Sequence, residues 1–134
     1  MANPSSLFPR PEQGDIVELI LDDHRRFESL LRDLRNDQND RDALRRQIAE
    51  LLVAHGEAEE SEVYPQLAEL DEQMAADAET EHSEARDGLA ALKEQIGQPG
   101  FAAALETLKG GIQHHVQEEE GQTFPKLRAS AAST

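Results

Sequence analysis

The sequence of 134 residues contains no cysteine, so no disulfide holds the fold together and no thiolate binds a metal. Aromatic residues make up only 4% of the chain, and the core must therefore consist mainly of leucine, isoleucine and alanine. Asp, Glu, Lys or Arg interrupts every apolar run, which excludes a segment that could span a bilayer.

Basic residues are scarce beside acidic ones. The chain has 13 Lys and Arg against 28 Asp and Glu, giving a formal net charge of −15 at pH 7. Such a surface repels phosphate backbones and anionic lipid, so neither a nucleic acid nor a membrane is expected as a partner, and no protein partner is indicated. No basic, apolar leader precedes the first helical pattern. We therefore expect a cytoplasmic protein, and the lack of cysteine suits a reducing compartment.

Four amphipathic segments predict an all-α fold. Ala, Leu, Glu, Gln, Arg and Lys dominate the composition, which favours helix. Apolar residues recur at steps of three and four along each segment, and polar or Gly/Pro-rich turns separate the segments. Four helices with short links predict an antiparallel up-down-up-down bundle. The four segments cover residues 17–34, 44–63, 75–96 and 101–119.

The chain length fits a single domain with short ends on either side. Residues 1–14 contain three prolines and Gly14, and they predict an extended N-terminal arm that ends where Asp15 caps the first helix. The helical domain is expected over residues 15–128. Residues 129–134 are small and polar and predict a disordered tail.

One motif occurs twice in the chain. HGEAEESEVYP begins at His55 and HVQEEEGQTFP begins at His115. Both read as His, three residues, Glu-Glu, three residues, an aromatic residue and Pro. The chain is therefore a pseudo-repeat of two helix pairs. The aromatic residues of the motif, Tyr64 and Phe124, are expected to pack at the end of the bundle.

Each of the four predicted helices carries one histidine on its apolar face. Mid-helix residues of an antiparallel bundle can reach the same level, so four imidazoles are expected to converge in the core. His114 lies about 100° around the helix from its neighbour and is expected on a flank. The four converging residues are His24, His55, His82 and His115.

Two glutamates follow these histidines at a spacing of four. Glu59 comes four residues after His55, and Glu119 four residues after His115, so each pair shares one helix face with Cβ atoms about 5–6 Å apart. A buried glutamate is costly unless it is paired or ligated. The pattern therefore predicts a metal site, and imidazole with carboxylate suits Fe, Mn, Zn or Co. The number of donors indicates two ions, with oxo, hydroxo or water groups completing the coordination.

Two other interpretations remain open at this point. A single histidine on an apolar face is more often a hydrogen-bonded core residue than a ligand, and a metal-free acidic bundle could bind a basic partner. The same donors could also hold Zn or Mn in a hydrolase, in which a metal-bound water is the nucleophile.

Residues 15–128 resemble the hemerythrin family, specifically the hemerythrin-like (HHE) cation-binding domains of H…HxxxE…H…HxxxE type. The resemblance rests on DHRRFESLL around His24, EHSEARDGL around His82 and the two copies of the motif. It implies an antiparallel four-helix bundle around an oxo- or hydroxo-bridged pair of iron ions. By that match the four histidines are iron ligands, and Glu59 and Glu119 are the bridging carboxylates.

The sequence departs from the oxygen-carrying hemerythrins in one respect. Those proteins have five histidine ligands, with two on the third helix in HxxxH spacing, whereas Ala78 and Arg86 stand four residues before and after His82. Glu79, three residues before His82, could supply the missing ligand, or water could.

The resemblance implies a protein that binds or reacts with oxygen, peroxide or nitric oxide. Because the fifth histidine is missing, sensing, redox or peroxide defence, or iron handling is expected rather than bulk oxygen transport. Enzymatic turnover of oxygen or peroxide is one of these possibilities.

Overall fold

The structure is a computed structural model that describes residues 16–132. Every regular element in this range is helical and no strand is formed there, which confirms the all-α class. The predicted arm at residues 1–14 and the predicted N-cap Asp15 lie outside the described residues.

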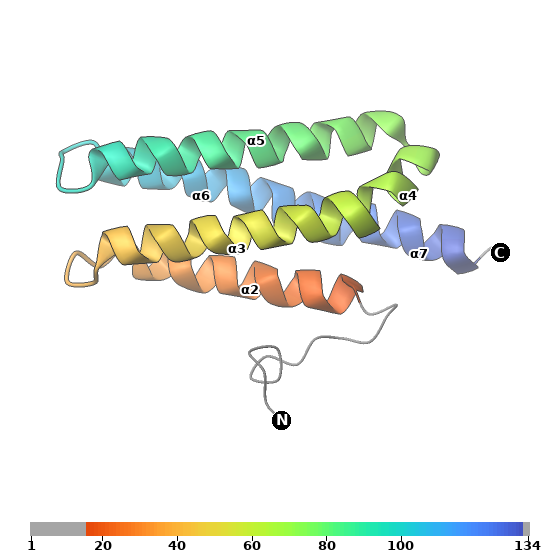
Figure 1. Ribbon diagram of the computed structural model, residues 1–134, viewed down its shortest axis with the longest axis horizontal. Helices are drawn as coiled ribbons and strands as arrows, with labels where there is room; N and C mark the ends of the chain where they lie inside the picture. The colour runs from red at the N-terminus through yellow and green to blue at the C-terminus, as the bar shows by residue number, and fades with distance from the viewer. Residues whose placement is uncertain (1–15, 133–134) are drawn as a thin grey trace, which may run out of the picture.

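Four long helices lie side by side (Figure 1). Each runs in the direction opposite to the long helix before it, and short connections join them at the two ends (Figure 1). Contacts run from α2 to α3, α3 to α5, α5 to α6 and α6 back to α2, so the four surround a common interior. The long helices are α2 (Ile16–Asp33), α3 (Arg41–Glu62), α5 (Glu72–Gln95) and α6 (Phe101–Glu118).

Polar caps and one glycine fix the connections. The Asp40 carboxylate accepts a hydrogen bond of 3.0 Å from the Ala43 N–H at the start of α3, and Asp71 accepts one of 3.0 Å from Met74 at the start of α5. Each cap satisfies an N–H group that the first helical turn leaves without a partner. Between α5 and α6 the chain turns at Gly97, whose φ of 79° is accessible to glycine at little cost.

The two copies of the repeated motif end their helices differently. In the first copy α3 ends at Glu62, and a short helix α4 (Tyr64–Leu70) begins with Pro65 in its first turn, where its missing N–H costs nothing. In the second copy α6 continues into a π-helical turn η1 (Glu119–Thr123), which leads without a break into α7 (Phe124–Ala132). The expected disorder from residue 129 is thus wrong up to Ala132, because the alanine-rich end continues the helix.

Two apolar clusters fill the interior, one on each side of the histidines. Along α2, Ile20 belongs to one cluster and Phe27 to the other, and His24 lies between them. Along α3 the structure buries Leu52 and leaves Leu51 half-buried. Leu52 lies closer than Leu51 to the direction shared by the buried residues of this helix, because each residue adds about 100°.

No helix within residues 16–132 combines the length and the apolar character needed to cross a membrane.

The core is expected to tolerate truncation poorly at its centre. Leu92 is completely buried on α5, whereas Leu70 is 43% exposed at the end of α4. Leu92→Ala should lower the free energy of unfolding by about 2–5 kcal/mol, because it removes buried methyl groups and leaves a cavity. The matched control Leu70→Ala should change it by no more than about 0.5 kcal/mol. Urea denaturation followed by circular dichroism measures both, and equal losses would show that the packing around Leu92 is misassigned.

Candidate metal centre

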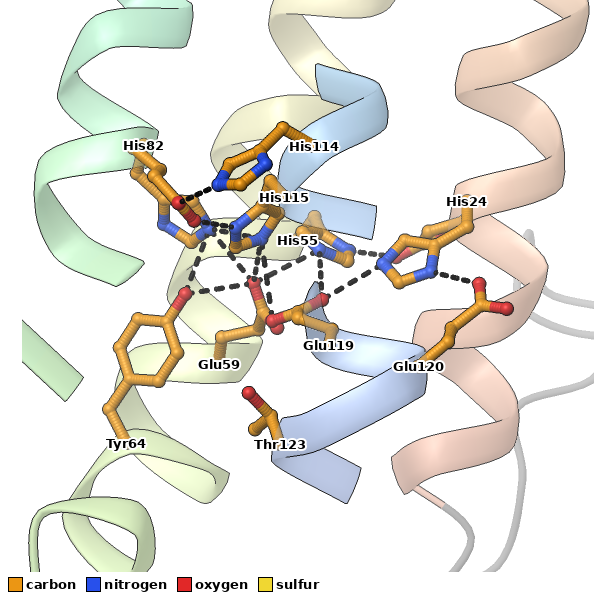
Figure 2. A network of polar contacts seen from close by, with 12 residues as sticks. His24, His55, Glu59, Tyr64, His82, His114, His115, Glu119, Glu120 and Thr123 are labelled. Atoms are coloured by element: carbon orange, nitrogen blue, oxygen red, sulfur yellow. Dashed lines mark hydrogen bonds and ion pairs between the residues drawn. The ribbon is translucent and has the colours of Figure 1, made fainter. Parts of the chain in front are cut away.

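The six residues that the sequence predicts as metal ligands meet at the centre of the interior (Figure 2). Each is at most 8% exposed, and Glu59 is completely buried. The helices α2, α3, α5 and α6 each bring one histidine, α3 brings the first glutamate, and the second begins η1. The six are His24, His55, Glu59, His82, His115 and Glu119.

Glu59 organises the first half of this cluster. Its Oε1 atom lies 2.9 Å from His82 Nε2, 3.0 Å from His55 Nε2 and 3.4 Å from His115 Nε2. One carboxylate oxygen thus faces the Nε2 atoms of three helices. We call this set, composed of His55, Glu59, His82 and His115, the Glu59 group; its ligand atoms all lie within 4.8 Å of one another.

Glu119 organises the second half. Its Oε1 atom lies 2.9 Å from His24 Nε2 and 3.8 Å from His55 Nε2. Its Oε2 atom lies 3.3 Å from His115 Nε2, which links this half to the Glu59 group. We call His24, His55 and Glu119 the Glu119 group; its ligand atoms also lie within 4.8 Å of one another. Because His55 belongs to both groups, the two candidate positions for a cation are adjacent.

Several buried atoms in the cluster have no hydrogen-bond partner. They include His55 Nε2 and one oxygen of each central glutamate, Oε2 of Glu59 and of Glu119. His82 Nε2 and His115 Nε2 face each other at 3.2 Å, although each nitrogen offers only one proton or one lone pair. Buried polar groups are normally satisfied. Imidazole nitrogens and carboxylate oxygens arranged in this way fit one or more transition-metal ions, which would take all of these lone pairs at once.

Three further carboxylates contact the Nδ1 atoms of three of the four interior histidines. His24 Nδ1 lies 2.8 Å from Glu120 Oε2, and His55 Nδ1 lies 3.2 Å from Asp23 Oδ2. A histidine that donates its Nδ1–H to a carboxylate keeps the Nε2 lone pair directed at the centre and becomes a stronger ligand. Figure 2 shows the Glu120 contact on the outer side of His24.

Asp23 and Glu81 occupy corresponding places in the two halves of the chain. Asp23 directly precedes His24 and contacts His55 on the next helix. Glu81 directly precedes His82 and lies 2.9 Å from His115 Nδ1 on α6. Sequence reasoning did not assign either residue. An acidic residue immediately before the interior histidine in both halves was the available signal.

Tyr64 also lies at the cluster, not only at the bundle end where packing was expected. Its hydroxyl donates a hydrogen bond of 3.1 Å to Glu59 Oε1 and lies 3.0 Å from His82 Nε2 (Figure 2). The side chain is only 3% exposed. Phe124, at the matching place in the second copy of the motif, packs in the apolar cluster as expected.

The structure does not bring Glu79 to the cluster. Glu79 is exposed on α5, because the buried face of that helix passes through the neighbouring Ala78, about 100° away. His114 lies on the flank, as expected: its side chain is 67% exposed and lies 3.0 Å from Glu118 and 3.3 Å from Glu81.

The cluster keeps the Glu59 carboxylate ionised despite its burial. Burial raises the pKa of Glu59, but hydrogen bonds from His115, His55 and His82 outweigh it and hold this pKa well below its usual value. Burial lowers the pKa of His55, yet its contacts with Asp23 and Glu59 raise it to about 9. Burial dominates at His24 and lowers its pKa. Negative charge is therefore available at the centre for a cation to replace the compensating protons.

An all-helical fold around buried imidazoles and carboxylates defines a protein of the cation-binding class. The family model of the hemerythrin HHE cation-binding domain matches residues 15–127, and the chain belongs to the hemerythrin family. No curated protein and no solved structure matches the chain.

The carboxylates on the Nδ1 atoms should tune metal affinity. We expect Glu81→Gln to weaken metal binding by about 10–100-fold, because it removes the charge that orients and polarises His115. Glu79→Gln, an identical change at an exposed position of the same helix, should leave the affinity unaltered. Competitive titration with Co²⁺, followed by its d–d absorption, compares the two variants. Equal effects would refute the roles assigned to both residues.

Proposed function

We propose that this chain is a di-iron protein with an antiparallel up-down-up-down four-helix bundle, and that it binds or reacts with oxygen, peroxide or nitric oxide. The observation that carries the proposal is the pair of adjacent ligand groups that share His55. Each group contains one central glutamate, and each glutamate has an oxygen without a hydrogen bond, Oε2 in both cases. Glu59 and Glu119 are thus suited to bridge two ions, with the four histidines as terminal ligands.

The donor types support iron within the cation-binding class. Imidazole and carboxylate without thiolate suit iron in its ferrous and ferric states, and the chain has no cysteine to favour a softer metal. When bound, a pair of iron ions supplies electrons and an open coordination position for a small oxidant.

The surroundings of the histidines favour a very small ligand. A cavity of about 10 Å³ adjoins them and is bounded by apolar side chains including Phe27, Leu52, Ile112 and Val116. That volume is roughly what one water molecule needs. Diatomic molecules and peroxide approach this size, whereas the substrates of a hydrolase exceed it.

The residues around His82 support sensing, defence or iron handling over bulk oxygen transport. Ala78 is buried and offers no donor atom, and Arg86 is exposed. Neither position supplies the fifth histidine of the oxygen-carrying proteins. The Glu59 group thus has three histidines and one glutamate, and the missing histidine supports turnover over reversible oxygen binding.

Metal analysis tests the proposal directly. Protein purified without added metal should contain close to two iron atoms per chain, and its oxidised form should show near-ultraviolet charge-transfer absorption from an oxo-bridged ferric pair. Removing the metal with a chelator should lower the melting temperature, since a ligand that binds only the folded state stabilises it. Zinc or manganese in place of iron, or an unchanged melting temperature after chelation, would contradict the proposal.

The geometry also indicates a route by which the small ligand reaches the centre. A surface groove of about 670 Å³ runs between α5 and α6. It shares three lining residues with the inner cavity, namely Glu81, Ala85 and Gly111. Two of the three have minimal side chains, so only a thin wall separates the groove from the histidines.

A larger side chain in this wall should obstruct the route and slow ligand binding. A Cβ atom at Gly111 would meet nothing within 4 Å, so Gly111→Leu can project into the groove without a clash at Cβ. We expect azide to bind the oxidised iron protein several-fold more slowly, with the iron content unchanged. Gly110→Leu is the matched control, since Gly110 also has open space around it, makes the same change in helix propensity and lines neither cavity. Stopped-flow absorption measures both rates, and equal rates would exclude this route.

A further inference from the structure

We infer that the Tyr64 hydroxyl is an additional protein ligand, bound as a phenolate to the ion of the Glu59 group. This inference rests on the proposed di-iron function and specifies the donor that completes one half of the site. Tyr64 belongs neither to the repeated His-x3-Glu pairs nor to the ligand set that the family resemblance implies.

The chain turns at the end of α3 in a way that directs Tyr64 inward. α3 ends at Glu62, one turn after Glu59, and α4 begins at Tyr64. The ring packs in the apolar cluster with Ile20 and Leu67, while its hydroxyl points at the histidines (Figure 2). The apolar contacts thus fix the ring and leave the oxygen at the polar centre.

The spacing of the hydroxyl oxygen matches that of a ligand atom. Two donors bound at right angles to one ion, with bonds of about 2.1 Å, lie about 3.0 Å apart. The Tyr64 oxygen lies 3.0 Å from His82 Nε2 and 3.1 Å from Glu59 Oε1. These separations lie between those of other atom pairs in the group, 2.9 Å from His82 Nε2 to Glu59 Oε1 and 3.2 Å from His82 Nε2 to His115 Nε2.

Hydrogen bonding alone does not account for this arrangement. His82 Nε2 lies within 3.2 Å of oxygen atoms of Glu59 and Tyr64 and of the Nε2 atom of His115. A ring nitrogen has one proton or one lone pair, so it can satisfy only one of the three contacts well. A shared cation satisfies all four atoms together. On binding, the ion takes the place of the Tyr64 hydroxyl proton, which is released to the buffer, and no electron is transferred.

Within the part of the chain that the structure describes, the Glu119 group has no equivalent phenolic oxygen. Phe124 stands where the repeat would place a second tyrosine, and its side chain lies in the apolar cluster. The phenolate would therefore bind only one of the two ions. Phenolate is a hard oxygen donor that suits ferric iron.

Vibrational spectroscopy of the iron-loaded protein tests the inference. The protein is loaded with Fe²⁺ without oxygen and then oxidised in air. A ferric phenolate gives a visible charge-transfer band, and resonance Raman excitation in that band should show tyrosinate ring modes that shift when the tyrosine is ring-deuterated. The chain contains a single tyrosine, so these modes can arise only from Tyr64. Tyr64→Phe should lose the visible band and the ring modes.

The control is Phe124→Leu, which alters the matching buried ring and should keep both signals. Wild-type protein that binds two iron atoms but shows no tyrosinate modes would overturn this inference and leave the di-iron proposal intact. Wild-type protein that binds no iron would overturn the proposed function itself. The wild-type spectrum decides the question even if a variant fails to fold.

Discussion

The burial of two glutamates is the constraint on which the rest of this structure depends. Glu59 and Glu119 have almost no exposed surface, and taking a carboxylate out of water is expensive unless charge and hydrogen bonds compensate for it. Neither glutamate can be compensated by its own helix alone, since a histidine four residues away reaches only one side of the carboxylate. The remaining compensation comes from His24 and His82 on the other two helices. The polar centre can therefore form only when all four long helices are in place.

This requirement shapes the packing above and below the centre. Apolar clusters lie on both sides of the histidines, and each contains residues from several helices. Because burial of apolar surface is non-directional, it can hold the helices together but does not fix their rotation. The contacts of Asp23 and Glu81 with histidines on the following helices supply that direction, since a rotated helix would leave these groups buried without partners. The apolar clusters thus hold the four helices together, and the polar centre fixes the rotation of each helix about its axis.

Helical periodicity was enough to predict the fold class and to bring the six central residues to one place, because it fixes which face of a helix a residue occupies. It does not fix how far a side chain reaches or which neighbour it meets. Asp23 and Glu81 were missed for that reason, since their partners lie more than 30 residues away in the chain. Glu79 was proposed from its spacing to His82, but the position of Ala78 in the interior turns it outward. Tyr64 was expected to pack at the bundle end. The sequence did not reveal the contact of its hydroxyl with Glu59, because that contact depends on the geometry of the turn between α3 and α4.

The two copies of the repeated motif have diverged at the positions that follow their glutamates. After Glu59 the helix breaks and restarts, and the restart directs a hydroxyl at the Glu59 group. Glu119 instead begins a π-helical turn, a form often found at functional sites, and Glu120 in that turn holds His24 from outside. The corresponding Nδ1 atom of His82 has no partner. One half of the site thus gains an inner oxygen donor, whereas the other gains an outer carboxylate, so two ions bound here would not be equivalent. With Phe124 in place of a second tyrosine, the Glu119 group has fewer protein donors than the Glu59 group.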